Sequence, residues 1–249
     1  MIIGFVTGLA AEARIARRLA GPASAGIADR GRPSPTLIAD GEPDAKPAPA
    51  WRDGALTAPV RAGGGTPAGA EAAARALVAD GVQALVSFGL AGGLDPALRP
   101  GALVVPTDVI EGGAVFATDP ALSARFGGPT PHRLLVAGSV LASASAKRDA
   151  ARSNAAQAVD LESGAVARVA RQHGLPFAVV RAICDPVERD LPPAALAALD
   201  PKGAIGAARV LGSLLRRPGQ IPALLGLAGD ASRARRALMA VSLRPIIPS

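Results

Sequence analysis

The chain has 249 residues, of which 49% are hydrophobic and 19% charged, so its composition suits a packed globular protein and excludes a disordered chain. Only 2% of the residues are aromatic, and the single cysteine, Cys184, excludes an internal disulfide. The net charge is +7, but stacking aromatics and DNA-binding motifs are missing, so we expect no nucleic-acid partner.

The pattern of apolar runs predicts strands that alternate with helices. In chain order we predict a strand over 2–6, helices over 10–20 and 68–80, strands over 83–89, 101–110, 132–138 and 157–161, a helix over 163–173 and a strand over 177–184. Thr66 is the predicted N-cap of the second helix, with Pro67 in its first turn. This alternation predicts an α/β fold with a mixed, mostly parallel central sheet covered by helices.

Two segments depart from this pattern. Residues 21–60 are rich in proline and glycine and predict an irregular excursion, in which 36–40 and 55–60 are possible short strands. We expect residues 1–214 to form one domain and residues 215–249 to form a basic helical extension. From residue 202 onward the chain carries eight basic residues against one acid, and leucines recur beside the arginines. Two interpretations stay open for the extension: packing on the domain, or contact with an anionic membrane surface.

The sequence also bears on cellular location. No apolar stretch approaches the length that spans a bilayer, and the N-terminus lacks the basic region of a signal peptide. We therefore expect a cytoplasmic protein, with peripheral contact on the inner face of the membrane if the extension binds lipid.

Acidic side chains and glycines follow four predicted strands. Gly8 and Glu12 follow the first strand, "LAGG" at 90–93 follows the second, Glu162 follows the strand over 157–161, and Asp185 ends the last one. Ligand sites of such sheets form beyond the carboxyl ends of the strands. Each feature has a purely structural alternative, since acids favour helix N-termini and aspartate favours turns. The coincidence of all four favours a binding site.

These segments resemble a known family. The similarity is to the nucleoside phosphorylase and nucleosidase superfamily, which includes purine nucleoside phosphorylase and methylthioadenosine nucleosidase. It rests on four segments in this order: "GFVTGLAAE", "ALVSFGLAGGLDPALRPGALVVP", "AVDLESGAVARVA" and "VVRAICDP". More narrowly, "GLAAEARIARR", "DLPPAALAAL" and "LLRRPGQIPALL" resemble the hopanoid-associated phosphorylase branch, which is thought to release adenine from adenosylhopane.

The resemblance implies roles for particular residues. Asp185 would be the catalytic acid and Glu12 the residue that activates water. Glu162 would bind the ribose hydroxyls beside Leu161, which stands where the family usually has methionine. Ala91 and Gly92, with Gly8, would line the base and sugar. Family members self-associate, so the resemblance also implies a homo-oligomer.

The chemistry of an N-glycosidic bond needs an acid for the leaving base and a group that positions the nucleophile. Asp185 and Glu12 suit these two tasks, provided that partial burial keeps Asp185 protonated. An acid at position 12 would repel phosphate, so we favour hydrolysis; phosphorolysis, with Arg14, Arg61 or an arginine from another subunit as the phosphate ligand, is the alternative. We expect no metal and no bound cofactor, and phosphate only as a co-substrate.

Three functions stay open at this point. The favoured one is cleavage of adenosylhopane, the second is cleavage of a soluble purine nucleoside of the methylthioadenosine type, and the third is non-catalytic nucleoside binding.

Overall fold

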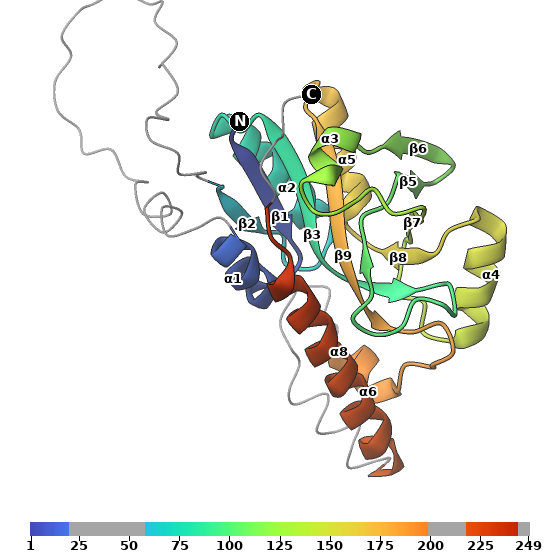
Figure 1. Cartoon of the computed structure of the whole chain (residues 1–249). Coiled ribbons are helices and arrows are strands. Elements are labelled where there is room, and N and C mark those ends of the chain that lie inside the picture. Colours follow the sequence, from blue (N-terminus) through green and yellow to red (C-terminus); the bar gives the residue numbers. More distant parts are fainter. Residues whose placement is uncertain (20–57, 199–217, 244–249) are drawn as a thin grey trace, which may run out of the picture.

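The computed structural model of the chain describes residues 1–19, 58–198 and 218–243 (Figure 1). In chain order its elements are β1 Ile3–Thr7, α1 Ala10–Leu19, β2 Val60–Ala62, α2 Pro67–Ala79, β3 Ala84–Gly93, β4 Leu103–Val104, β5 Asp108–Glu111, β6 Ala114–Ala117, α3 Pro120–Ala124, β7 Arg133–Val136, α4 Ala144–Asn154, β8 Ala158–Asp160, α5 Ser163–Gln172, β9 Phe177–Asp185, α6 Pro193–Ala198, the 3-10 helix η2 Pro218–Gln220 and α8 Ile221–Ala240. Most of the predicted excursion and the predicted boundary at 214/215 lie outside the described residues.

The strands form one mixed sheet of nine strands, in the order β2-β1-β3-β8-β7-β5-β6, with β9 paired to β3 and β4. β1, β3 and β9 run parallel, so their carboxyl ends meet at one edge of the sheet. β8 is antiparallel to the end of β3, where Gly92 pairs with Val159. This arrangement confirms the predicted α/β class with a mixed, mostly parallel sheet.

Two apolar cores lie on the two faces of the sheet (Figure 1). α2 and α5 cover one face, where Leu77 and Val166 are fully buried. α1 and α8 cover the other face, where Ile15 and Leu238 pack with Phe88. Because the helices fill both faces, a ligand can approach the central strands only at the ends of the sheet.

The start of α2 is formed as the sequence predicts. Thr66 is the N-cap residue and its Oγ1 accepts a hydrogen bond of 3.1 Å from the amide of Gly69. Pro67 occupies the first helical position, where its missing amide hydrogen is not needed.

Several elements differ from the prediction, and β6, α3 and α6 were not predicted at all. The single strand expected over 101–110 is two short strands, β4 and β5, because Pro106 between them has no amide hydrogen for a sheet ladder. β3 continues to Gly93, so the expected loop at 90–93 is a strand end. Helix α4 was not predicted, because only Ala144 and Lys147 of its residues are buried and an apolar periodicity is therefore weak.

Helix α8 differs between its two halves. In its C-terminal half, Ala234 and Leu238 are buried against the sheet, as the packing interpretation of the basic extension expects. In its N-terminal half, Ile221 and Leu225 are exposed, at 47% and 68%. Within residues 1–19, 58–198 and 218–243, no helix combines the length and the apolar character that crossing a bilayer requires.

Candidate active site

Glu12 lies in the first turn of α1 and is 4% exposed. Its Oε2 accepts a hydrogen bond of 2.8 Å from the amide of Leu9, which is the cap-type contact that the structural alternative predicts. Its Oε1 accepts a second bond of 3.0 Å from the amide of Leu90 in β3. Glu12 therefore does more than cap its own helix, because it also fixes the end of β1 against the neighbouring strand.

The carboxylates of Glu162 and Glu12 converge beside Gly8. A Cβ atom at Gly8 would lie 2.7 Å from Oε2 of Glu162 and 3.1 Å from Oε2 of Glu12. Glu162 occupies the N-cap position of α5, but its side chain makes no capping hydrogen bond. Its Oε1 is buried and has no hydrogen-bond partner among the described residues. Glu162 is thus placed like a ligand-binding group with a free acceptor.

The electrostatic surroundings make Glu162 unusual. Burial raises the pKa of its carboxyl to about 7, and the charges of Asp160 and Glu12 act in the same direction. The guanidinium of Arg181 and a backbone hydrogen bond from Gly65 act in the opposite direction. Near neutral pH this carboxyl is therefore close to half-ionised.

Arg181 organises a buried polar cluster beneath the two glutamates. Its Nη2 lies 2.5 Å from Oδ2 of Asp160 and donates hydrogen bonds to Oγ of Ser87, at 2.7 Å, and Oγ of Ser163, at 3.0 Å. Asp160 also accepts from the Ser163 hydroxyl at 2.6 Å. The cluster joins β3, β8, β9 and the start of α5, so it fixes the segment from which Glu162 projects.

Asp185 lies at the end of β9, where its backbone pairs with Gly92 of β3. Its Oδ2 is 2.6 Å from Nζ of Lys147, while its Oδ1 is buried and has no hydrogen-bond partner among the described residues. Burial raises the pKa of Asp185, and the neighbouring Lys147 ammonium opposes this shift. Like Glu162, Asp185 keeps one carboxylate oxygen available for a ligand.

The remaining predicted site residues line the same strand ends. Gly8 is buried in the bend after β1, and Leu161 is half-buried in the bend before α5. Ala91 and Gly92 lie near the C-terminal end of β3, and the pairing register with β9 shifts between them. No contact places these residues on a ligand, so their binding roles stay predictions.

The structure thus brings the predicted residues to one edge of the sheet. Glu12 and Glu162 meet at Gly8, and Glu12 is hydrogen-bonded to β3, whose end pairs with Asp185. Burial raises the pKa of Cys184 to about 12, and the charges of Asp185 and Glu12 act in the same direction, so this thiol is a poor nucleophile.

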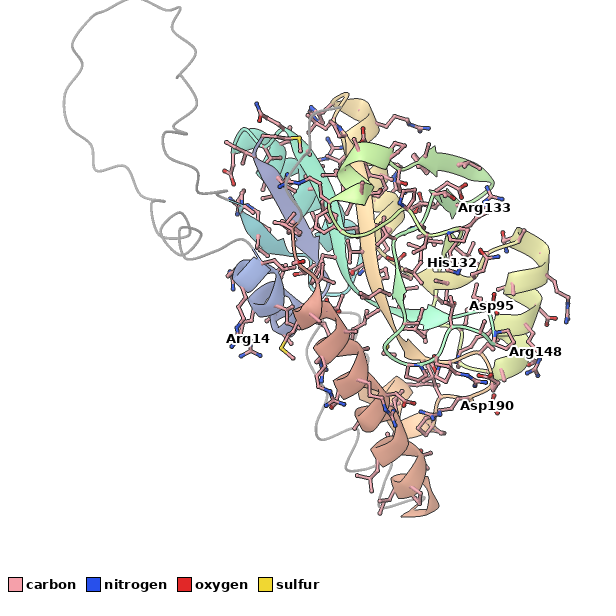
Figure 2. All side chains as sticks on the ribbon, viewed as in Figure 1. Arg14, Asp95, His132, Arg133, Arg148 and Asp190 are labelled. Carbon is pink, nitrogen blue, oxygen red and sulfur yellow. The ribbon has the colours of Figure 1, made fainter. Side chains whose placement is uncertain are left out.

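The arginines considered for phosphate lie elsewhere. Arg14 is exposed on the outer side of α1 (Figure 2). Arg61 forms an exposed ion pair of 2.6 Å with Asp80. Nη2 of Arg181, near the glutamates, is engaged by Asp160 and the two serines, whereas its buried Nε has no partner among the described residues. The guanidiniums of Arg14 and Arg61 are not placed to hold a phosphate dianion beside Glu12.

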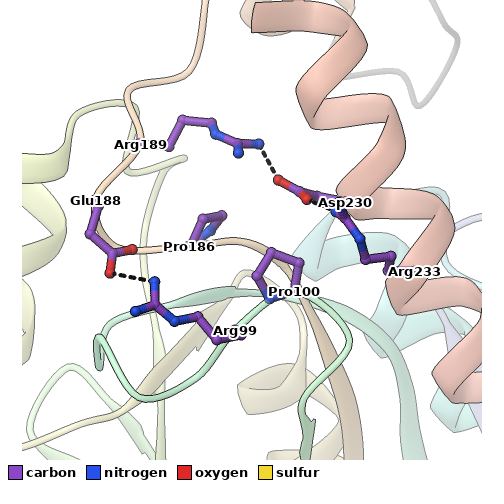
Figure 3. A pocket seen from close by; sticks show the side chains of 7 residues that line it. All are labelled: Arg99, Pro100, Pro186, Glu188, Arg189, Asp230 and Arg233. Carbon is purple, nitrogen blue, oxygen red and sulfur yellow. Dashed lines mark hydrogen bonds and ion pairs between the residues drawn. The ribbon is translucent and has the colours of Figure 1, made fainter.

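A cavity of about 590 Å³ lies next to the strand end that carries Asp185. Its lining is formed by Arg99, Pro100, Pro186, Glu188, Arg189, Asp230 and Arg233 (Figure 3). Arg99 pairs with Glu188, and Asp230 pairs with both Arg189 and Arg233. The predicted site residues do not line it, and each of its three guanidiniums is in an ion pair with Glu188 or Asp230, so we assign the chemistry to the strand ends and not to this cavity.

Sequence reasoning missed Lys147 and Arg181. Each had a signal: Arg181 interrupts the apolar run "FAVVRAIC", and a charge inside a buried strand needs a partner. Lys147 is harder to recognise from the sequence, because it lies among alanines and other charged residues. Within the described ranges, no three His, Cys, Asp or Glu side chains are grouped so that they could hold a metal ion.

The chain matches a family described as the phosphorylase superfamily, over residues 58–133 and 133–216. No curated protein matches it.

Several solved structures share the fold. Futalosine hydrolase of Helicobacter pylori has a TM-score of 0.60 at 16% identity, over 87% of this chain and 97% of that one. The 5'-methylthioadenosine/S-adenosylhomocysteine nucleosidase of the same organism has a TM-score of 0.60 at 15% identity, over 96% of each chain. The S-adenosylhomocysteine nucleosidase of Streptococcus pyogenes, solved with 5-methylthiotubericidin, has a TM-score of 0.58 at 17% identity, over 96% of this chain and 94% of that one.

Proposed function

Because the chain belongs to the phosphorylase superfamily, we propose that it cleaves the N-glycosidic bond of an adenine nucleoside by hydrolysis. The observation that carries this proposal is the pair of buried carboxylate oxygens without partners, Oε1 of Glu162 and Oδ1 of Asp185, at one edge of the sheet. Family membership supports an enzyme that breaks such a bond over the binding protein considered above. The solved nucleosidases with the same fold support adenine as the base.

Each carboxylate has a distinct task in the proposed reaction. Asp185 donates a proton to the leaving base, since its raised pKa favours the protonated form. Glu162 accepts hydrogen bonds from the sugar hydroxyls through Oε1. Glu12, held by the amides of Leu9 and Leu90, orients and deprotonates the attacking water. Both glutamates favour the positive charge that develops on the sugar ring in the transition state.

Water is favoured over phosphate as the nucleophile for an electrostatic reason. The carboxylates of Glu12 and Glu162 converge on the Cβ side of Gly8, so a phosphate dianion there would meet two carboxylates. Phosphorolysis is the second candidate, and its support is that the buried Nε atoms of Arg181 and Arg235 have no partner among the described residues.

We propose adenosylhopane as the substrate, on the resemblance to the hopanoid-associated branch, and a soluble nucleoside of the methylthioadenosine type as the alternative. The test is adenine release by the full chain from both compounds, each with and without phosphate. Release from adenosylhopane in phosphate-free buffer, at a rate that phosphate does not raise, is expected. Strict dependence on phosphate would refute hydrolysis, and release from the soluble nucleoside alone would refute the lipid substrate.

The N-terminal half of α8 is proposed to contact an anionic membrane. This half of the helix extends beyond the sheet (Figure 1) and carries the exposed Ile221 and Leu225, and Arg236 in the C-terminal half is also exposed. The protein is expected to sediment with vesicles that contain anionic lipid, and Leu225→Glu is expected to lower the bound fraction severalfold, because it places a charge in the apolar contact. Val115→Glu, at another exposed apolar position, on β6, is the control and should bind as the wild type does. Equal binding by both variants would contradict this contact.

A further inference from the structure

We propose that Lys147 is a positioning residue that holds Asp185 by Oδ2 and thereby leaves Oδ1 as the oxygen that carries the transferred proton. This inference rests on the catalytic role proposed above for Asp185. It assigns a function to a lysine on α4, a helix that the proposed reaction does not otherwise use.

The burial of Lys147 needs an explanation. Its side chain is 1% exposed, although the helix around it is mostly exposed or half-buried. Lysine is almost never fully buried unless its charge is paired, because removing an ammonium from water is costly. The role of Lys147 therefore lies in its polar contacts and not in the packing of α4.

The partners of Lys147 account for its whole donor capacity. Its Nζ lies 2.6 Å from Oδ2 of Asp185 and donates to the backbone oxygens of Pro186, at 3.1 Å, and Arg189, at 2.9 Å. An ammonium has three N–H donors. With all three engaged, Lys147 has no donor left for a substrate, so it acts through Asp185.

The two oxygens of Asp185 consequently have different tasks. Oδ2 faces the ammonium and cannot carry a proton without losing that contact, whereas the buried Oδ1 has no partner among the described residues. In the proposed step, the proton on Oδ1 passes to a ring nitrogen of the base as the C1'–N bond breaks and its electron pair moves to the base. Asp185 is left as a carboxylate, and the adjacent ammonium stabilises the new negative charge.

Other charges around Asp185 act in both directions. Burial raises its pKa, Lys147 on α4 and Arg189 after β9 lower it, and Asp230 on α8 raises it. Lys147 is the only one of these side chains with a hydrogen bond to the carboxyl among the causes of the shift. Removing Lys147 should therefore move the titration of Asp185 to higher pH.

The segment after β9 has attachments to α4 that do not involve Lys147. Oδ1 of Asp190 accepts from the amide of Ala144 at 2.7 Å, and the amide of Leu191 donates to the oxygen of Ala142 at 2.7 Å. These bonds should hold the segment in place when Lys147 is replaced by an apolar side chain of similar length.

The test compares Lys147→Met with Arg148→Met in the full chain. Arg148 is the next residue of α4 and is exposed (Figure 2), so it controls for loss of one positive charge from the helix. The carboxyl of Asp185 is titrated by carbon NMR, assigned from the spectrum of Asp185→Asn. Lys147→Met is expected to raise the pKa of Asp185 by about one unit or more, and Arg148→Met to leave it unchanged. Equal titration in wild type and Lys147→Met would overturn the proposal.

Activity gives a second readout. In Lys147→Met, kcat should begin to fall at a higher pH than in the wild type, and this shift should equal the shift in the Asp185 titration. If Lys147→Met does not fold, Lys147→Arg keeps the charge but changes its geometry, and it is expected to lower kcat about tenfold or more. A Lys147→Arg enzyme with the wild-type kcat and pH profile would overturn the positioning role. Adenine release at the wild-type rate in Asp185→Asn would instead refute the general-acid role of Asp185, and no adenine release by the wild type would refute the proposed function; in both cases the NMR result for Lys147 would stand independently.

Discussion

Replacing Asp185 with asparagine is expected to lower kcat for adenine release about 10³-fold, within the range for loss of a general acid. The amide has nearly the same shape as the carboxyl, but it cannot give a proton to the leaving base. Glu12 and Glu162 remain in place, so binding of the nucleoside should change much less than turnover. The measurement is adenine release at saturating substrate, together with the Kd of the nucleoside.

The matched control for this experiment is Asp149→Asn. Asp149 is on α4, is largely exposed and pairs only with Arg152 among the described residues. This variant should keep the wild-type kcat, and both variants should show a cooperative thermal transition. A loss of less than about tenfold in folded Asp185→Asn would argue against general acid catalysis by this residue.

Replacing Glu162 with glutamine is expected to stabilise the protein above neutral pH by up to about 3 kcal/mol. Burial raises the pKa of this carboxyl from 4.5 to about 7. At about pH 4 the group is mostly protonated in both states and contributes little. Between pH 4.5 and about 7 the unfolded chain releases the proton while the folded chain retains it, so wild-type stability falls as pH rises. Urea unfolding at about pH 4 and pH 8 measures the difference.

Glu71→Gln is the control for this prediction. Glu71 forms an exposed pair with Arg75 on α2, so its replacement should change stability by less than about 0.5 kcal/mol at either pH. A Glu162→Gln variant with the wild-type pH dependence would show that this carboxyl titrates normally. The stabilised variant should bind the nucleoside more weakly, because an amide replaces the carboxylate acceptor for the sugar hydroxyls. Such a result would mean that Glu162 is kept for binding at the expense of stability.

The sequence predicts the central elements well where a periodic apolar pattern is strong. β1, α1, α2, α5 and β9 lie within a few residues of their predicted bounds, since each buries a continuous face against the sheet. The pattern fails for α4, whose buried face is an alanine and a lysine, and for 101–110, where Pro106 divides one apolar run into two strands.

The candidate site divides in a similar way. Its carboxylates were found because strand ends are visible in the sequence, and the parallel order of β1, β3 and β9 brings these ends together. The partners Lys147 and Arg181 were not found, because an ion pair between residues distant in the chain leaves no local pattern. The raised pKa of Glu162 likewise depends on burial and on neighbours that only the fold supplies.

Two glycines limit how the pocket can be re-engineered. A Cβ atom at Gly89 would lie 2.5 Å from Nη1 of Arg181 and 2.9 Å from Oε1 of Glu12, and one at Gly8 would crowd Glu162. Any larger side chain at either position would displace the charged groups themselves. Substitutions meant to admit a bulkier or smaller nucleoside therefore have to spare Gly8 and Gly89.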